Sequence, residues 1–474
     1  MMHTRTRGLA LLLAGSATLT ACASVPELGP KPQIRAAATI ASGQALASTA
    51  DAWPADGWWT AYNDPQLSKL IDEALAGAPD LAVAAARLRQ AEGYAQQAGA
   101  ALLPSVDATG SAGYVKQSKN NGVPAQFVPD GWRQQGKIGL NLSFNLDLWG
   151  KNRASLAAAT SDAEAARYEL AEARLALTTG IAATYADLVT LHAQRDTLES
   201  ALAIREDTLR LVSTRVATGL DTRAELKQAQ SRVPATRAEL AATDEAIALT
   251  RNALAALVGA GPDRALTIVR PKAVALKAQG VPMGASIDLI GRRPDIAAAR
   301  ASVEAAASRI KVARAAFYPD ISLSALIGLQ SLGFDNLFKG NSTFGSAGPA
   351  ISLPIFHGGA LQGQYRGARG AYDEAVARYD SGVIQALRQV ADAATSQKAL
   401  IVRLSESRAA LADAEEGNAL ARKRYEGGLS SYLDVLSAEE GVLEARQTVA
   451  ELEARAFTLD IAMVRALGGG FQAS

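Results

Sequence analysis

The stretch from Lys137 to Leu148 reads KIGLNLSFNLDL, and its pattern decides what kind of fold this chain can form. Large apolar residues alternate one for one with polar residues or glycine over about a dozen positions, which predicts a β-strand with one apolar face. This length also suits a tilted strand that crosses a lipid bilayer. The apolar face comprises Ile138, Leu140, Leu142, Phe144, Leu146 and Leu148.

A very long helix is expected directly after this strand. Trp149-Gly150 ends the strand, and the chain from there to Gly219 contains no proline, a run far longer than an ordinary globular helix. Its apolar residues recur at spacings of three and four, a period that indicates coiled-coil packing. The stripe comprises Leu177, Ile181, Leu188, Leu191, Leu198, Leu202, Leu209, Val212 and Val216, with Arg195 and Arg205 interrupting it.

The composition narrows the class of function. The 474 residues include 48 Lys plus Arg and 47 Asp plus Glu, so the chain lacks the basic excess expected of a nucleic-acid-binding protein. Hydrophobic residues make up 49% of the chain but aromatic residues only 5%. Such alanine-rich, charge-laced sequence favours long helices that pack closely side by side, and no nucleic-acid partner is expected.

The first 22 residues predict export and a lipid anchor. Basic residues precede the short apolar run Gly8–Ala21, which is typical of a secretory signal peptide covering residues 1–21. The sequence Leu19-Thr20-Ala21-Cys22 resembles a bacterial lipoprotein box, which implies acylation at Cys22, as in palmitate-bearing lipoproteins, and sorting to the outer membrane. The alternative is an ordinary signal peptide followed by an incidental cysteine. Cys22 is the only cysteine, so no disulfide within the chain is possible.

The remainder of the chain repeats one pattern. Pro79 and Pro104 lie 25 residues apart, as do Pro294 and Pro319, and each pair is followed by an alternating stretch that predicts a strand. Near the end of each long helix, Arg424, Gly428 and Leu429 repeat Arg215, Gly219 and Leu220. The expected order is an extended proline-rich arm (22–65), a first repeat (66–258) with a β-hairpin at about 105–148, a linker (259–284), a second repeat (285–470) with a β-hairpin at about 320–356, and a tail (471–474).

Two hairpins supply four strands, which cannot close a barrel because about eight is the practical minimum. An open sheet edge is also forbidden in lipid, where its N–H and C=O groups would lack partners. The chain is therefore expected to assemble with copies of itself. A dimer would give eight strands and a packed interior, whereas a trimer would give twelve strands and an open pore.

Several motifs, in order along nearly the whole chain, resemble the outer-membrane efflux protein family typified by TolC, in its NodT- and OprM-like lipoprotein branch. They are the lipoprotein box at Cys22, Trp58-Trp59, Asp64-Pro65, Arg292-Arg293-Pro294-Asp295-Ile296, Phe317-Tyr318-Pro319, Arg424-Tyr425, Tyr432-Leu433-Asp434-Val435-Leu436 and Ala466-Leu467-Gly468-Gly469-Gly470.

The resemblance implies a mixed α and β fold. An outer-membrane β-barrel, with four strands per protomer and twelve in a homotrimer, would be continued into the periplasm by a long α-helical coiled-coil barrel. The implied function is passive exit of drugs or other small molecules that an inner-membrane pump of the RND type delivers through a periplasmic adaptor protein. A channel for type I protein secretion and a periplasmic coiled-coil lipoprotein without a pore are the alternatives.

Three residues are candidates for the periplasmic aperture. The resemblance implies that Asp434 lines the narrow end of the tunnel, where three carboxylates would attract cations, and that Tyr425 and Arg424 hold neighbouring helices together. The alternative for Asp434 is a helix capping box with Ser431, which needs no pore. Ser437 departs from family members that carry a second acid there, so a single ring of carboxylates is expected.

The matching turns Gly219-Leu220 and Gly428-Leu429 are candidate contacts for the adaptor protein, because an exposed leucine at both turns is unusual. The alternative is that glycine simply permits the positive φ of a tight turn.

An enzymatic function finds little support in the sequence. His192 and His357 are the only histidines after the signal peptide, and no His, Cys, Asp or Glu spacing suits a metal, so neither an enzyme nor a cofactor is expected.

Overall fold

The computed structural model describes residues 24–36, 39–44, 46, 52–272 and 280–473. The expected signal peptide and Cys22 lie outside the described residues. The chain forms two compact units. The first comprises the described part of Met1–Ile34 with Leu88–Ala166 and Ala299–Tyr379, and the second comprises the described parts of Arg35–Arg87, Arg167–Ala298 and Asp380–Ser474.

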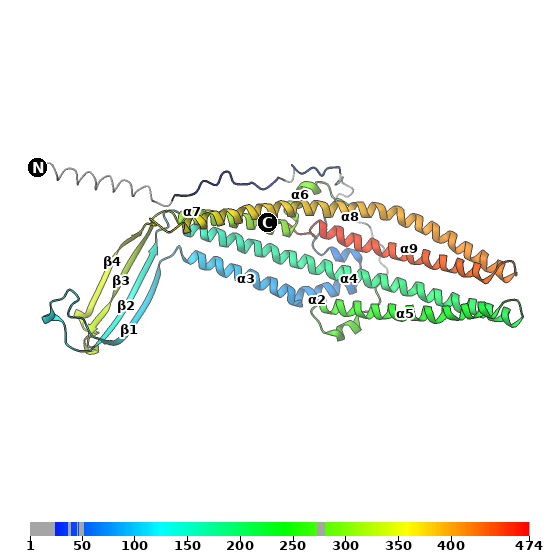
Figure 1. The fold of residues 1–474 in the computed structure, drawn as a ribbon, viewed down its shortest axis with the longest axis horizontal. Coiled ribbons are helices and arrows are strands. Elements are labelled where there is room, and N and C mark those ends of the chain that lie inside the picture. Colours follow the sequence, from blue (N-terminus) through cyan, green and yellow to red (C-terminus); the bar gives the residue numbers. More distant parts are fainter. Residues whose placement is uncertain (1–23, 37–38, 45, 47–51, 273–279, 474) are drawn as a thin grey trace. The chain divides into compact units, whose positions relative to one another are not determined.

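The first unit contains one antiparallel four-stranded sheet, in which the strands lie side by side in chain order (Figure 1). The strands are β1 (Ser105–Val115), β2 (Arg133–Asn145), β3 (Asp320–Leu332) and β4 (Thr343–Ser352). Because β2 pairs with β3, the two predicted hairpins join into a single sheet. Among the residues that the structure describes, β1 and β4 each pair on one side only, which leaves both outer edges of the sheet open.

The strand register collects apolar side chains on one face of the sheet. Val106 lies opposite Leu142, Leu142 opposite Ala325, and Ala325 opposite Ala347. Cross-strand partners share a face, so the alternation seen in β2 continues across all four strands. Large apolar residues of this face remain exposed, namely Val106, Tyr114, Ile138, Leu140, Leu142, Leu323, Ile327 and Ile351.

Both hairpins end earlier than the sequence predicts. Strand β2 was expected to reach Leu148 but ends at Asn145, because Asp147 adopts a positive φ of 44° and its carboxylate accepts the backbone N–H groups of Asn152 and Arg153 at the start of the next helix. The second hairpin was expected to reach about residue 356 but ends at Ser352. Pro354 lacks an N–H to continue the ladder.

Three pairs of helices have matching lengths. The pairs α3 and α7 have 22 residues each, α4 and α8 have 67 each, and α5 and α9 have 35 each. A 67-residue helix is about 100 Å long. None of the helices in the described residues is both long and apolar enough to cross a membrane. The bounds are α2 Pro65–Gly77, α3 Pro79–Ala100, α4 Lys151–Ala217, α5 Arg223–Leu257, α6 Ala285–Arg292, α7 Pro294–Ala315, α8 Ala360–Glu426 and α9 Tyr432–Ala466.

The core of the second unit is built around aromatic residues that precede α2. Trp58 meets Trp59 and Tyr62 edge to face, and the Tyr62 hydroxyl donates a hydrogen bond of 2.7 Å to the buried carboxylate of Asp460 on α9. This aromatic segment is thus held against α9 by a specific hydrogen bond as well as by apolar contacts. Helices α2, α4 and α9 complete the core with Leu67, Leu70, Ile71, Ile181, Tyr185, Leu188, Phe457, Ile461 and Val464.

Candidate functional site at the helical hairpin turns

The two long hairpins, α4–α5 and α8–α9, end in turns of the same geometry. Gly219 and Gly428 have φ of 77° and 73°, a conformation that costs glycine little. Leu220 N–H donates to the Arg215 carbonyl and Leu429 N–H to the Arg424 carbonyl, each at 2.8 Å, which satisfies the last carbonyls of the preceding helix. The leucine side chains that follow are 66% and 74% exposed.

The helices that leave these turns begin with matching caps. Glu225 accepts the backbone N–H of Thr222 at 2.6 Å, and Asp434 accepts the backbone N–H of Ser431 at 2.9 Å. The Ser431 hydroxyl also donates to Asp434, at 3.0 Å. The carboxylate of Asp434 therefore caps α9, as the alternative interpretation proposed, and its side chain is also exposed.

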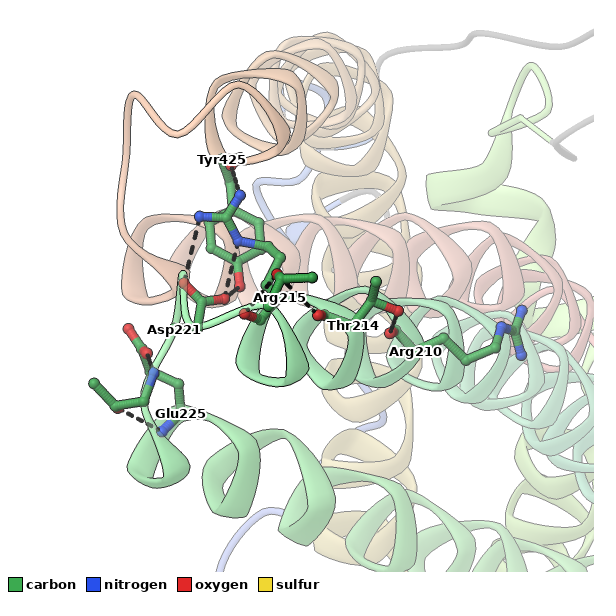
Figure 2. A network of polar contacts seen from close by, with 8 residues as sticks. Arg210, Thr214, Arg215, Asp221, Glu225 and Tyr425 are labelled. Carbon is green, nitrogen blue, oxygen red and sulfur yellow. Dashed lines mark hydrogen bonds and ion pairs between the residues drawn. The ribbon is translucent and has the colours of Figure 1, made fainter.

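A charged network joins one hairpin to the other (Figure 2). Arg215 on α4 forms an ion pair with Asp221 in its own turn, with Nε and Oδ2 at 3.0 Å. The Tyr425 hydroxyl on α8 donates to the same carboxylate, and Arg215 Nη1 donates to the Tyr425 carbonyl at 2.9 Å. The Arg215 guanidinium also lies 4.4 Å from the centre of the Tyr425 ring, within the range of a cation–π contact.

The protonation states of this network favour the contact between the two hairpins. Burial raises the pKa of the Tyr425 hydroxyl, and its hydrogen bond to Asp221 raises it further, so the hydroxyl remains a donor. The hydrogen bond to Asp221 likewise raises the pKa of Arg215, so the guanidinium stays charged. Both side chains of the Arg215–Asp221 pair are largely buried, which strengthens their attraction relative to a surface pair.

An apolar cluster lies beside the network. Tyr425 and Tyr432 are both buried, with ring centres 6.2 Å apart. The cluster combines residues of all four helices, so the two hairpins share one core near their turns. Its buried members are Val212, Ala229, Tyr425, Tyr432, Val435 and Leu436.

The three predicted aperture residues take different roles within one chain. Tyr425 is buried and bonded to Asp221, whereas Asp434 is exposed and bonded to Ser431. Arg424 is exposed, and its side chain makes no hydrogen bond or ion pair within the described residues. One chain therefore does not bring the three side chains together.

Arg215 and Asp221 were not among the site residues predicted from the sequence. Arg215 was recognised only as the repeat equivalent of Arg424, yet it is Arg215 that joins the hairpins. Asp221 occupies the position of Ser430 in the second repeat, so the one acid that differs between the two turns was the available signal.

His192, the residue considered for an enzyme, is buried on α4. Burial lowers the pKa of its imidazole, with a further contribution from Arg251, so the ring is neutral. Its Nε2 has no hydrogen-bond partner in the part of the chain that the structure describes. Among the residues that the structure describes, no group of three or more His, Cys, Asp or Glu could hold a metal ion.

A sheet with an exposed apolar face, joined to long helical hairpins that are bonded to each other at their turns, defines the class of outer-membrane export proteins. The chain belongs to the outer membrane efflux protein family, whose sequence model matches residues 70–260 and 287–469.

Individual relatives agree with this assignment. The chain is 32% identical to the multidrug resistance outer membrane protein MdtP of Escherichia coli O6:H1, with 98% of this chain and 97% of MdtP aligned. The crystal structure of the outer membrane protein VceC from Vibrio cholerae matches with a TM-score of 0.84 and 44% identity, covering 89% of this chain and all of VceC. The outer membrane channel CmeC of Campylobacter jejuni matches with a TM-score of 0.85 and 26% identity, over 96% of each chain. The protein is therefore an outer-membrane efflux protein.

Proposed function

We propose that three copies of this chain form the outer-membrane channel of a three-component efflux system. The channel would be a passive exit for drugs or other small molecules, delivered by an inner-membrane pump of the RND type through a periplasmic adaptor protein. The name of the relative MdtP, a multidrug resistance protein, supports drugs as the cargo. The observation that carries the proposal is the apolar sheet with two open edges.

The open edges require a partner strand once the sheet enters lipid. Each unpaired N–H or C=O group in the hydrocarbon region costs several kcal/mol. Pairing β4 of one copy with β1 of the next satisfies both edges and keeps the alternating antiparallel order. Three copies give twelve strands, enough to leave an aqueous pore where eight would fill with side chains.

The network at the hairpin turns is the proposed closing device of the periplasmic end. Arg215, Asp221 and Tyr425 bind the hairpin α4–α5 to the hairpin α8–α9, and separating the hairpins requires these bonds to break. Asp434 is exposed beside this contact, which supports a carboxylate ring that attracts cations. Arg424 is exposed and its side chain is unbonded among the described residues, which supports a contact with a neighbouring copy.

The exposed Leu220 and Leu429 are the proposed contacts for the adaptor protein. Both follow a glycine whose positive φ directs the chain through the turn, at Gly219 and Gly428. Each of the two equivalent turns thus exposes a large apolar side chain that a coiled-coil partner could cover.

The proposed attachment to the outer membrane includes lipidation at Cys22. The extended arm that follows is held on α8, where Arg369 donates hydrogen bonds to the carbonyls of Gly29 and Pro30, and the Tyr372 hydroxyl donates to the carbonyl of Pro32. These bonds fix the arm in the unit that contains the sheet. A fixed arm of this kind supports an anchor that acts together with the barrel.

Conductance separates the proposal from its alternatives. The purified full-length protein should have a mass of three chains in detergent and should pass ion current in a planar bilayer, whereas a coiled-coil lipoprotein without a pore would pass none. Deletion of the gene should raise sensitivity to small toxic compounds. Loss of a secreted protein with unchanged sensitivity would instead favour the protein-secretion channel.

A further inference from the structure

An acidic residue occupies the core between the two hairpins. Glu439 lies on α9 between Leu436 and Val442, on the same buried stripe, and is only 4% exposed. Glutamate is rarely buried without an ion-pair partner, because removing a carboxylate from water costs several kcal/mol. Packing alone therefore does not account for this residue.

The Glu439 carboxyl group is bonded to the other hairpin. The hydroxyl of Thr208 on α4, which is 2% exposed, donates a hydrogen bond to Glu439 Oε1. Glu439 lies seven residues beyond Tyr432 on α9, which corresponds to about 10 Å along the helix. The bond therefore lies on the opposite side of the apolar cluster from the network of Arg215, Asp221 and Tyr425.

The surrounding arginines are already engaged. Arg205 on α4 donates to the Thr236 hydroxyl, Arg232 on α5 pairs with Glu440 at 2.6 Å, and Arg422 on α8 pairs with Glu426 at 3.4 Å. No arginine or lysine within the described residues forms an ion pair with Glu439. The titratable and charged groups that act on it are Arg205, Arg422, Tyr432 and Glu440.

We propose that Glu439 is a second, protonation-dependent contact between the hairpins, one that holds them together when its carboxyl group is neutral and favours their separation when it is ionised. The inference rests on the proposed function, since separation of the hairpins is taken to open the channel. It assigns to Thr208 and Glu439 the role of positioning residues for the periplasmic aperture.

The direction of the pH effect follows from the surroundings of the carboxyl group. Burial raises the pKa of Glu439, although Thr208, Arg422 and Arg205 each lower it in part. When the hairpins separate, water reaches the group and its pKa falls toward the ordinary value of about 4.3. The stabilisation that Glu439 gives the packed state is thus fully present below the ordinary pKa. It is lost as the pH rises through the raised pKa of the packed state. Each pKa unit by which Glu439 differs between the packed and the separated state changes the ratio of separated to packed hairpins by up to about tenfold.

The experiment measures single-channel open probability of the full-length protein in planar bilayers between pH 4.5 and 8. The wild-type channel should open more as the pH rises, by about tenfold for each unit by which the two pKa values differ. Glu439→Gln, whose side chain is permanently neutral, should remove this rise of open probability with pH. Glu444→Gln is the matched control, because Glu444 is exposed on the same helix and should leave the pH profile unchanged.

The outcomes distinguish the inference from the proposed function. A wild-type protein that passes no current at any pH would contradict the channel itself. A conducting channel in which the Glu439→Gln profile superimposes on the wild-type profile would overturn the role of Glu439. Where the glutamine variant does not assemble, Glu439→Leu provides the same neutral, similarly sized side chain, and a wild-type pH profile in that variant would have the same meaning.

Discussion

Asp434 shows how one carboxylate can serve both the fold and the proposed aperture. Its Oδ2 accepts both bonds from Ser431, while the side chain remains exposed to solvent. A single carboxylate oxygen is enough for the cap, so capping does not exclude a role in the pore. The two roles differ in one property, because the cap needs an acceptor and the pore needs a negative charge.

Asp434→Asn should therefore reduce cation preference without a large loss of stability. The amide oxygen can still accept the bond from Ser431, so the free energy of unfolding should change by less than about 1 kcal/mol. Reversal potentials in a salt gradient measure the selectivity. Glu225→Gln is the matched control, since Glu225 has the same capping role in the other hairpin. Equal selectivity in both variants and the wild type would rule out Asp434 as a pore carboxylate.

Tyr425 and Tyr432 provide a matched pair for testing the network. Both are buried in one cluster, yet it is the Tyr425 hydroxyl that donates a hydrogen bond to Asp221 of the other hairpin. Tyr425→Phe removes that donor and leaves the carboxylate of Asp221 to Arg215 alone, at a cost of about 1–3 kcal/mol to the closed contact. Single-channel recordings should show a higher open probability for Tyr425→Phe than for Tyr432→Phe. The same behaviour in both variants would assign the effect to core packing.

At the level of elements, the period of the sequence predicts which segments are strands and helices, but tertiary geometry decides where they end. The alternation in Lys137–Leu148 continues through Leu146 and Leu148, although the strand stops at Asn145, because the positive φ of Asp147 turns the chain. A local pattern does not encode that turn.

Strand β4 carries a weaker sequence signal than the other strands. It contains Gly345, Gly348 and Pro349, residues that would disfavour a central strand. Pro349 nevertheless lies within β4, opposite Leu323 of β3. The hydrogen bond between Tyr425 and Asp221 could not be predicted from a local sequence pattern either, because the two residues lie 204 positions apart.

The end of α9 depends on a glycine that no other residue can replace. Gly468 has φ of 89°, and an added Cβ would lie 1.9 Å from the carbonyl oxygen of Arg292. Gly468→Ala should destabilise the protein by several kcal/mol and lower the yield of folded protein. Gly441→Ala, inside α9 with open space around it, should instead stabilise by about 0.5–1 kcal/mol. Thermal unfolding of both variants gives the comparison, and similar melting temperatures would contradict the close contact.

The exposed leucines at the two hairpin turns can be tested as contacts for the adaptor protein. Replacing Leu220 and Leu429 together with Asp should abolish drug resistance while leaving the oligomer intact, because two new charges oppose an apolar contact with the adaptor. Leu249→Asp, an equally accessible leucine within α5, is the control for a general effect of charge on the helices. Resistance is measured by growth in the presence of drug, and unchanged resistance in the double variant would rule out the turns as adaptor contacts.

For the whole molecule, the open edges of the sheet explain why one chain is incomplete. The alternation of β2 predicts a membrane strand, and the count of four strands predicts self-association. The structure adds the order β1-β2-β3-β4, which places the first and last strands at opposite edges. The sequence predicts only that copies associate, whereas the strand order predicts which strands meet, namely β4 of one copy and β1 of the next.

A cysteine pair can test this contact, because β1 and β4 of one chain cannot reach each other. Two strands separate them, which at the usual strand spacing amounts to about 14 Å, whereas a disulfide needs Cβ atoms about 3.8 Å apart. Ala112→Cys in β1, combined in turn with Thr343→Cys, Ala347→Cys or Ile351→Cys on the same face of β4, should give covalent trimers with at least one combination. Non-reducing gels detect them, and each single variant is a control. If every combination yields only monomers while the protein conducts, the copies must close the sheet through other strands.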